Sequence, residues 1–162
     1  MTGCWLGRVS MAGIIVLGLS WFNGARAGDN LVDSKLSPCL SEKVVLGGVN
    51  SCGKVWKLGA GQARVDKDGS VNVELTGLVL NDTSVGEFNG TPDGVDAIAI
   101  ALVCDGKVAS QTDSVTLSQK GNATVNAKLT VPQTCGAPTV LVRERYEGKI
   151  GGWLASAGAA GK

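Results

Sequence analysis

Histidine is absent from the 162 residues of this chain. A Ser-His-Asp or Cys-His catalytic set is therefore excluded, because both need an imidazole as the general base. Zinc and copper sites built on imidazole ligands are excluded for the same reason. Acid–base chemistry would have to rest on carboxylates, on lysines or on Tyr146, the single tyrosine.

The sequence also lacks an apolar run of membrane-spanning length. Residues 11–22 form an apolar run of twelve residues, whereas a helix needs about 20 to cross the hydrocarbon core. Arg8 precedes this run, and Ala25-Arg26-Ala27 follows it, which is the order of a secretory signal. We therefore predict a signal peptide over residues 1–27 and one exported domain over residues 28–162, outside the cell or in the periplasm and with no further membrane span.

Neither sign of charge dominates the predicted exported domain. From Gly28 onward, 13 Lys and Arg stand against 14 Asp and Glu, a net charge of −1. A binder of nucleic acid or of an anionic membrane relies on a strong positive field. The composition therefore argues against both, and leaves an unidentified extracellular partner or surface as the expectation.

Close cysteine pairs are missing as well. Cys4 lies in the predicted signal, and Cys39, Cys52, Cys104 and Cys135 remain. An even number of cysteines in an exported chain predicts two disulfides, for which three pairings are formally possible. A four-thiolate zinc site usually needs C-x₂-C pairs, so we predict no metal ligands and no cofactor. Paired cysteines also leave no thiolate nucleophile.

What the sequence does contain is alternation of apolar and polar residues. In residues 70–80, Val71, Val73 and Leu75 point to one side of a predicted strand and the polar residues between them to the other. Residues 123–131 follow the same pattern, and residues 62–65 join the first strand through a turn at 66–69. Period-two alternation indicates strands with one buried and one solvated face.

Residues 95–104 differ, because they are almost continuously apolar. They form either a central strand covered on both faces or a short helix, and their Ile and Val content favours the strand. The remaining candidate strands are residues 107–112, 115–117 and 139–143, a last strand around 153–156, and 44–46 and 55–58 near the front. About eight short strands without an amphipathic helix predict an all-β fold, an antiparallel β-sandwich or small barrel.

Strand order also favours one disulfide pairing. If strands 95–104 and 139–143 lie side by side and antiparallel, Cys104 faces the residues around Cys135. That bridge would close a loop of about 30 residues, which chain entropy values at roughly 3.5–4 kcal/mol. Cys39 and Cys52 would then pair and pin residues 31–41, which we expect to be otherwise untethered.

Four stretches of the chain carry a resemblance. These are DGSVNVELTGLVLND, ALVCDGKV, TCGAPTVLVRE and GGWLASAG. Their arrangement resembles small exported bacterial β proteins of uncharacterised function. The resemblance implies export, a β domain and a disulfide between the last two cysteines, and it implies no activity.

The one gathering of acidic residues is a long Gly- and Asn-rich loop, residues 81–96. Long loops in compact domains often carry function. Its carboxylates could bind calcium, could supply a pair for glycoside hydrolysis, or could serve turns on a solvated surface. Phe88 is either a contact residue at the loop tip or a cap folded back onto the core. The candidate binding residues of this loop are Asp82, Glu87, Phe88, Asp93 and Asp96.

These observations lead to a functional hypothesis without catalytic residues. We expect a non-enzymatic exported domain that presents loops for binding or has a structural role. The alternative is a small extracellular carboxylate-based hydrolase or a calcium-dependent binding module that uses residues 81–96. The carboxylates of this loop should converge on one point in the alternative and spread into solvent otherwise. An inhibitor that inserts the loop into an enzyme cleft would need the loop to be rigid and protruding.

Overall fold

The computed structural model describes Met1, Gly3 and residues 30–40 and 43–158. Apart from Met1 and Gly3, the predicted signal peptide over residues 1–27 lies outside the described residues. No helix in residues 30–40 or 43–158 is long and apolar enough to cross a membrane.

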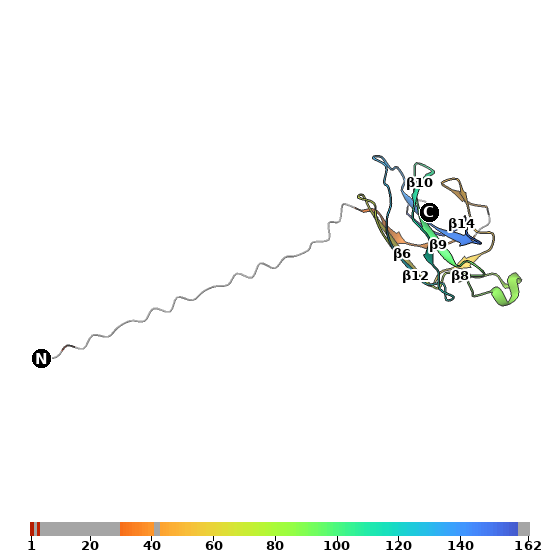
Figure 1. Ribbon diagram of the computed structural model, residues 1–162, viewed down its shortest axis with the longest axis horizontal. Helices are drawn as coiled ribbons and strands as arrows, with labels where there is room; N and C mark the ends of the chain where they lie inside the picture. The colour runs from red at the N-terminus through yellow and green to blue at the C-terminus, as the bar shows by residue number, and fades with distance from the viewer. Residues whose placement is uncertain (2, 4–29, 41–42, 159–162) are drawn as a thin grey trace.

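Two antiparallel sheets make up most of the domain (Figure 1). The first sheet has the order β1-β6-β7-β12. Its strands are β1 (Asn30–Lys35), β6 (Ala60–Asp66), β7 (Ser70–Thr76) and β12 (Ala123–Lys128). We call it the open sheet, because one of its faces is solvated. In β7, Val71, Val73 and Leu75 are buried while the residues between them are exposed, which confirms the predicted alternation.

The second sheet has the order β10-β9-β13-β14-β2, and a further short strand pairs with β9. We call it the covered sheet. Its strands are β9 (Ala97–Cys104), β10 (Lys107–Gln111), β11 (Val115–Thr116), β13 (Thr139–Tyr146), β14 (Lys149–Gly158) and β2 (Ser37–Pro38). β1 contacts β14 and β11 contacts β12, so the two sheets approach each other along both sides in a sandwich-like arrangement.

Two small two-stranded sheets and one short 3₁₀ helix complete the described fold. β3 (Val45–Leu46) and β4 (Val49–Asn50) form a hairpin. β5 (Trp56–Lys57) pairs with β8 (Val79–Leu80), which follows β6 and β7 in the chain. The helix is η1 (Thr83–Phe88). The prediction of an all-β antiparallel fold is confirmed. Six of the described strands have only two residues, among them those at the predicted positions 44–46, 55–58 and 115–117.

All eight residues of β9 are buried, which confirms the prediction of a central strand covered on both faces. Its neighbours are β13 and β10 in the plane of the sheet. The hairpin of β3 and β4 covers part of one face, because a side chain on Gly47 would lie 2.5 Å from Cγ2 of Val103. Gly47 has a φ of +61°, so both the space and the backbone require glycine there.

Both disulfides follow the predicted pairing. Thr139 of β13 lies opposite Val103 of β9, which places Cys104 beside the segment that carries Cys135, and the two Cα atoms are 4.7 Å apart. The other bridge joins Cys39 to Cys52 with a Cα separation of 6.1 Å.

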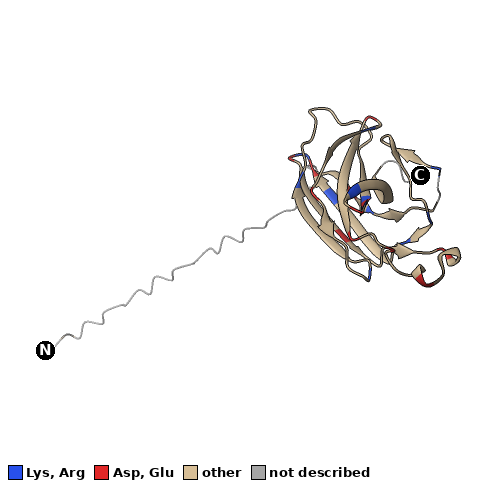
Figure 2. Ribbon diagram, turned by 45° about the vertical axis from the view of Figure 1, so that its right-hand side comes forward, with Lys and Arg blue, Asp and Glu red and all other residues tan. Residues whose placement is uncertain are grey.

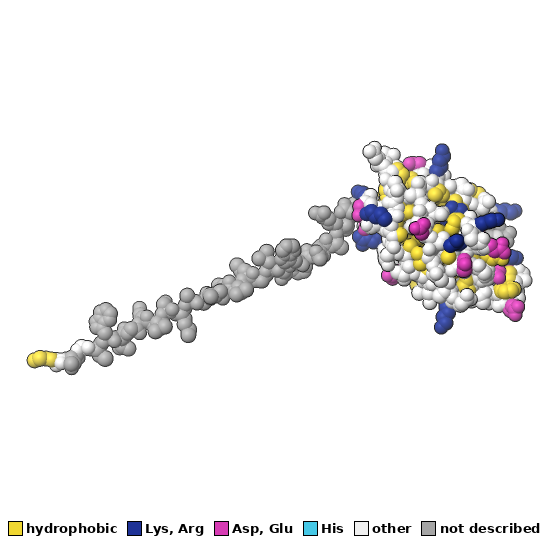
Figure 3. Space-filling view, viewed as in Figure 1, with side chains coloured by type: hydrophobic (Ala, Val, Ile, Leu, Met, Phe, Trp, Pro, Cys, Tyr) yellow, Lys and Arg dark blue, Asp and Glu magenta, His cyan; other side chains and the backbone are white. Residues whose placement is uncertain are grey.

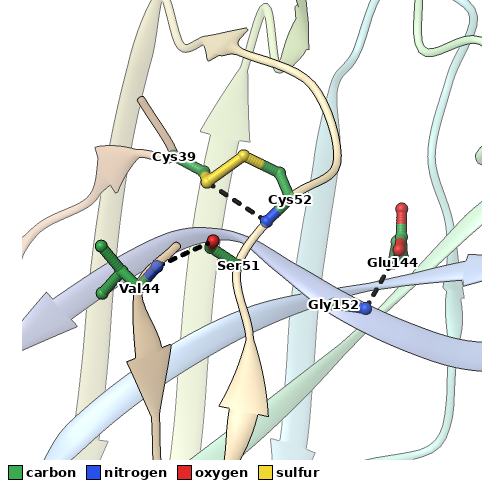
Figure 4. Close-up of a disulfide and its surroundings, with 6 residues drawn as sticks. All are labelled: Cys39, Val44, Ser51, Cys52, Glu144 and Gly152. Atoms are coloured by element: carbon green, nitrogen blue, oxygen red, sulfur yellow. Dashed lines mark hydrogen bonds between the residues drawn. A yellow bond between two sulfur atoms is a disulfide. The ribbon is translucent and has the colours of Figure 1, made fainter. Parts of the chain in front are cut away.

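The Cys39–Cys52 bridge fastens the hairpin of β3 and β4 to the body of the domain (Figure 4). Cys52 N donates to Cys39 Sγ at 3.2 Å, and Val44 N donates to Ser51 Oγ at 3.2 Å. Ser51 also forms an isolated bridge with Trp153 of β14. The hairpin is therefore held by a covalent bond and by the covered sheet.

The expectation of an untethered segment over residues 31–41 is wrong for its described part. β1 pairs with β6 from Asn30 to Lys35, and β2 pairs with β14. Ser34 occupies an inward position between Val32 and Leu36, and the register shifts between Asn30 and Val32. A polar inward residue and a bulge together disguise the strand pattern.

Candidate functional site

Backbone hydrogen bonds close the first part of the loop of residues 81–96, the part that carries η1. Leu80 N donates to Thr91 O at 2.9 Å, and Gly90 N donates to Leu80 O at 3.0 Å. Asn81 N donates to Val55 O at 2.8 Å, which ties the start of the loop to the segment before β5. We call residues 81–96 the acidic loop, because it holds four carboxylates and no Lys or Arg.

Asp82 organises the first half of the acidic loop. Its Oδ1 accepts hydrogen bonds from Ser84 N at 2.9 Å and Ser84 Oγ at 2.6 Å, so it caps η1. These bonds lower the pKa of Asp82, with a smaller contribution from Lys54, whose Nζ lies 3.8 Å from Oδ2. Asn89 Oδ1 accepts from Asp82 N at 3.1 Å and joins the two ends of η1. Asp82 therefore serves the loop conformation.

Phe88 lies at the end of η1 with its side chain half exposed. The residue is 49% exposed, while its carbonyl oxygen accepts from Thr91 N at 3.0 Å and Thr91 Oγ1 at 2.7 Å. The backbone is fixed although the ring contacts solvent. Figure 1 shows η1 projecting from the body of the domain, in green.

The other acidic side chains of the loop do not gather. Glu87 and Asp96 are exposed, and Asp93 is half-buried with a φ of +42°. No group of three or more Asp, Glu, Cys or His side chains in residues 30–40 and 43–158 is placed to hold a metal ion. Figure 2 shows acidic positions spread along the projecting segment. The predicted candidate residues thus lie in one loop, but their carboxylates do not converge on a common ligand position.

Tyr146 is a neighbour of this loop, whereas the sequence indicated it only as a group for acid–base chemistry. A side chain on Gly94 would lie 2.8 Å from Cε2 of Tyr146, so the tyrosine ring packs directly against the Gly94 backbone. Tyr146 is 48% exposed. Because it comes from the end of β13, far along the chain, no local signal indicated the contact.

Arg143 donates its hydrogen bonds within the covered sheet. Its Nε and Nη2 donate to Gly151 O at 3.1 and 2.7 Å, and its Nη1 donates to Gln111 Oε1 at 2.8 Å. Burial lowers the pKa of Arg143, and neighbouring Glu144 opposes that shift. The guanidinium therefore holds the bulge region of β13 and β14 and joins it to β10.

Charges of both signs are interspersed over the face of the domain seen in Figure 3. Trp56 and Trp153 are buried, at 4% and 6% exposure, so they pack in the core and offer no aromatic face to a ligand. The visible surface does not carry a single-sign field of the kind that polyanions need.

A groove of about 780 Å³ lies on the open sheet, at the end where β6 begins and β7 ends. Sequence analysis missed it, because its lining comes from all four strands of that sheet and the segment before β6. The polar residues that line it are Lys35, Gln62, Glu74, Thr76, Asn122 and Thr124, and the apolar ones include Leu36, Leu58, Ala60 and Ala123.

Comparison with protein-family models, with curated proteins and with solved structures finds no match to this chain. The two disulfides suggest an oxidising environment outside the cytoplasm.

Proposed function

We propose that this protein is an exported, non-enzymatic binding domain that presents the acidic loop to an extracellular protein. The observation that carries the proposal is Phe88, half exposed on a loop whose backbone is fixed by its own hydrogen bonds. Export rests on the signal-like residues 1–27 and on the two disulfides.

The loop has the properties of a contact element. Exposed aromatic side chains often dominate the free energy of binding at protein interfaces. A loop that is already ordered loses little conformational entropy on association, so more of the contact energy appears as affinity. Phe88 is such an aromatic, and the hydrogen bonds of Asp82 and Thr91 supply the order.

The charge of the loop indicates the character of its partner. Four carboxylates and no cation surround Phe88 along the chain. Complementary charges steer association and discriminate among partners. We therefore infer a partner with an apolar pocket bordered by Lys or Arg.

The calcium-dependent or hydrolytic alternative has less support. Both chemistries need carboxylates that face a shared point, and those of the acidic loop are dispersed. Calorimetric titration with Ca²⁺ separates the two hypotheses, because a calcium module would release or take up heat and gain in melting temperature.

The test is site-specific crosslinking followed by affinity measurement. A photo-reactive phenylalanine analogue is placed at position 88 of the exported protein, and at position 147 as a control on the turn between β13 and β14. A protein crosslinked from position 88 alone is then purified and titrated. Phe88→Ala should weaken its binding by about tenfold or more, as for an interfacial hot spot, whereas Glu147→Ala should not. Equal crosslinking at both positions, or unchanged affinity of Phe88→Ala, would refute the proposal.

A further inference from the structure

We propose that the groove on the open sheet is a second binding site, and that its ligand is a neutral, hydroxyl-rich oligosaccharide. This inference does not rest on the acidic loop, because the groove is built from different strands. Its volume of about 780 Å³ lies within the range of ligand sites in proteins.

Strand register places one polar side chain of the groove on each strand of the open sheet. Lys35 of β1 lies opposite Gln62 of β6, Gln62 opposite Glu74 of β7, and Glu74 opposite Thr124 of β12. Neighbouring strands are about 4.8 Å apart, so this row extends for roughly 14 Å across the sheet. A row of that length suits an oligomer better than a single ring.

The hydrogen-bonding groups of this row are free to take a ligand. Among the described residues, the side chains of Lys35, Glu74 and Thr124 make no hydrogen bond or ion pair. Gln62 donates through Nε2 to Asp33 Oδ1 at 2.8 Å, which leaves its amide oxygen available. Asn122 accepts from Gly77 N through Oδ1 at 3.0 Å, which leaves its amide nitrogen available.

The adjacent row on the same face is different, because each of its residues already has a hydrogen-bond partner within the sheet. Asn72 Nδ2 donates to Asn126 Oδ1 at 2.8 Å, and Arg64 Nε donates to Asp66 Oδ1 at 3.0 Å. Both rows are solvated and both are polar. Only the row inside the groove combines a concave surface with unused donors and acceptors.

The chemistry of the lining selects a neutral ligand. Lys35 and Glu74 contribute one charge of each sign, and the other polar groups are amides and hydroxyls. A polyanion or a polycation would meet one like charge in the groove. A sugar hydroxyl donates and accepts hydrogen bonds, so it can use the ammonium, the carboxylate and the amides together. Exposed Ala60, on the same face as Gln62, offers a small apolar contact for the C–H face of a sugar ring, whereas Leu58 packs against Gly61 on the inner face.

Affinity should be modest, because no aromatic residue lines the groove. Hydrogen bonds to solvated side chains exchange with water and contribute little each. We expect a dissociation constant in the millimolar range, which corresponds to roughly −4 kcal/mol.

The experiment is an NMR titration of the exported protein with both disulfides formed. The probes are cellotetraose, maltotetraose and N-acetylchitotetraose, with tetralysine and a sulfated heparin tetrasaccharide as charged comparisons. Backbone amides of residues 35–36, 58–62, 74–76 and 122–124 should shift with at least one neutral tetrasaccharide. The absence of shifts with all three at millimolar concentration, shifts outside the groove, or equal binding of a charged probe would overturn the proposal.

Two conservative variants sharpen the test. Glu74→Gln should weaken binding about tenfold, because it removes a charged acceptor, and Thr124→Val should weaken it about two- to tenfold. Glu147→Gln and Thr130→Val make the same chemical changes at exposed positions outside the groove and should bind as the unmodified protein does. Melting temperatures of all four variants should match that protein, since none of these four side chains has a hydrogen-bond partner among the described residues. If the two groove variants retain full affinity, the groove is not the site.

Discussion

Strand β7 is an inner strand of the open sheet and β9 an inner strand of the covered sheet, but the burial of their side chains differs. In β7 every second residue is buried, whereas β9 is buried at all eight positions. Both strands have paired neighbours on each side. The difference comes from what lies above and below them, because the covered sheet has the hairpin of β3 and β4 over part of its second face.

Because of this difference, residues of β9 determine stability, whereas the outward residues of β7 determine the chemistry of the surface. A strand covered on both faces can contribute only packing, so each of its residues is constrained by volume. A strand with one solvated face can vary its outward residues at little cost in stability. The groove lies on the outward residues of the open sheet, where changes of ligand-binding side chains leave the core intact.

The largest expected effect is at the centre of the covered sheet. Ile100→Ala should lower the free energy of unfolding by about 2–5 kcal/mol, because Ile100 is fully buried. Its neighbour Ala101 is also fully buried, and Ala101→Leu should cost about 1–3 kcal/mol through overpacking. Glu74→Ala in β7 should stay within about 0.5 kcal/mol. Urea denaturation of the three variants measures these differences, and tolerance of Ala101→Leu would contradict a second covered face.

An effect of similar size is expected for the disulfides. Replacing both cysteines of the Cys104–Cys135 bridge by serine should cost roughly 3.5–4 kcal/mol, and replacing those of the Cys39–Cys52 bridge about 3 kcal/mol, because the second loop is shorter. The second change should also speed hydrogen exchange in β3 and β4, which that bridge fastens. Exchange that rises equally throughout both sheets would mean that the hairpin is not a separate cover.

The smallest expected effect is at the turn between β6 and β7. Hydrogen bonds from Lys128 and Ser70 lower the pKa of Asp68 from 3.8 to about 2. A pKa lowered by folding gives stability that is present above pH 4 or so and is lost as the pH falls toward 2. Asp68→Asn should therefore reduce the loss of melting temperature between about pH 5 and pH 2, and added salt should weaken the difference because the pair is exposed. If the melting temperature of Asp68→Asn falls with pH as much as that of the unmodified protein, other carboxylates cause the loss of stability in acid.

Much of the fold could be predicted, because buried positions of a strand are apolar and alternate with polar ones, as Val71, Val73 and Leu75 do. The continuous apolar run of β9 and the placement of Cys104 near Cys135 followed from the same logic. β1 was missed because it is an edge strand in which polar Ser34 faces inward and a bulge shifts the register. η1 was missed because six residues are too few to show a helical period.

The candidate sites were less predictable than the fold. The acidic loop could be identified from its length and composition, although the exposure of Phe88 could not. The groove depends on register between strands far apart in the chain, since Lys35, Gln62, Glu74 and Thr124 become neighbours only when four strands pair. Alternation indicates which residues point outward but not which ones meet.

The pairing of β2 with β14 has a consequence for biosynthesis. Ser37 lies opposite Ser156 and Pro38 opposite Ala155, and Cys39 N donates to Leu154 O at 2.8 Å. A strand near the start of the described domain is thus joined to its last strand, so the covered sheet cannot be completed before β14 has been synthesised. Such non-local topology also slows folding. If the protein is exported as proposed, the polypeptide should therefore cross the membrane unfolded and acquire its bridges only afterwards.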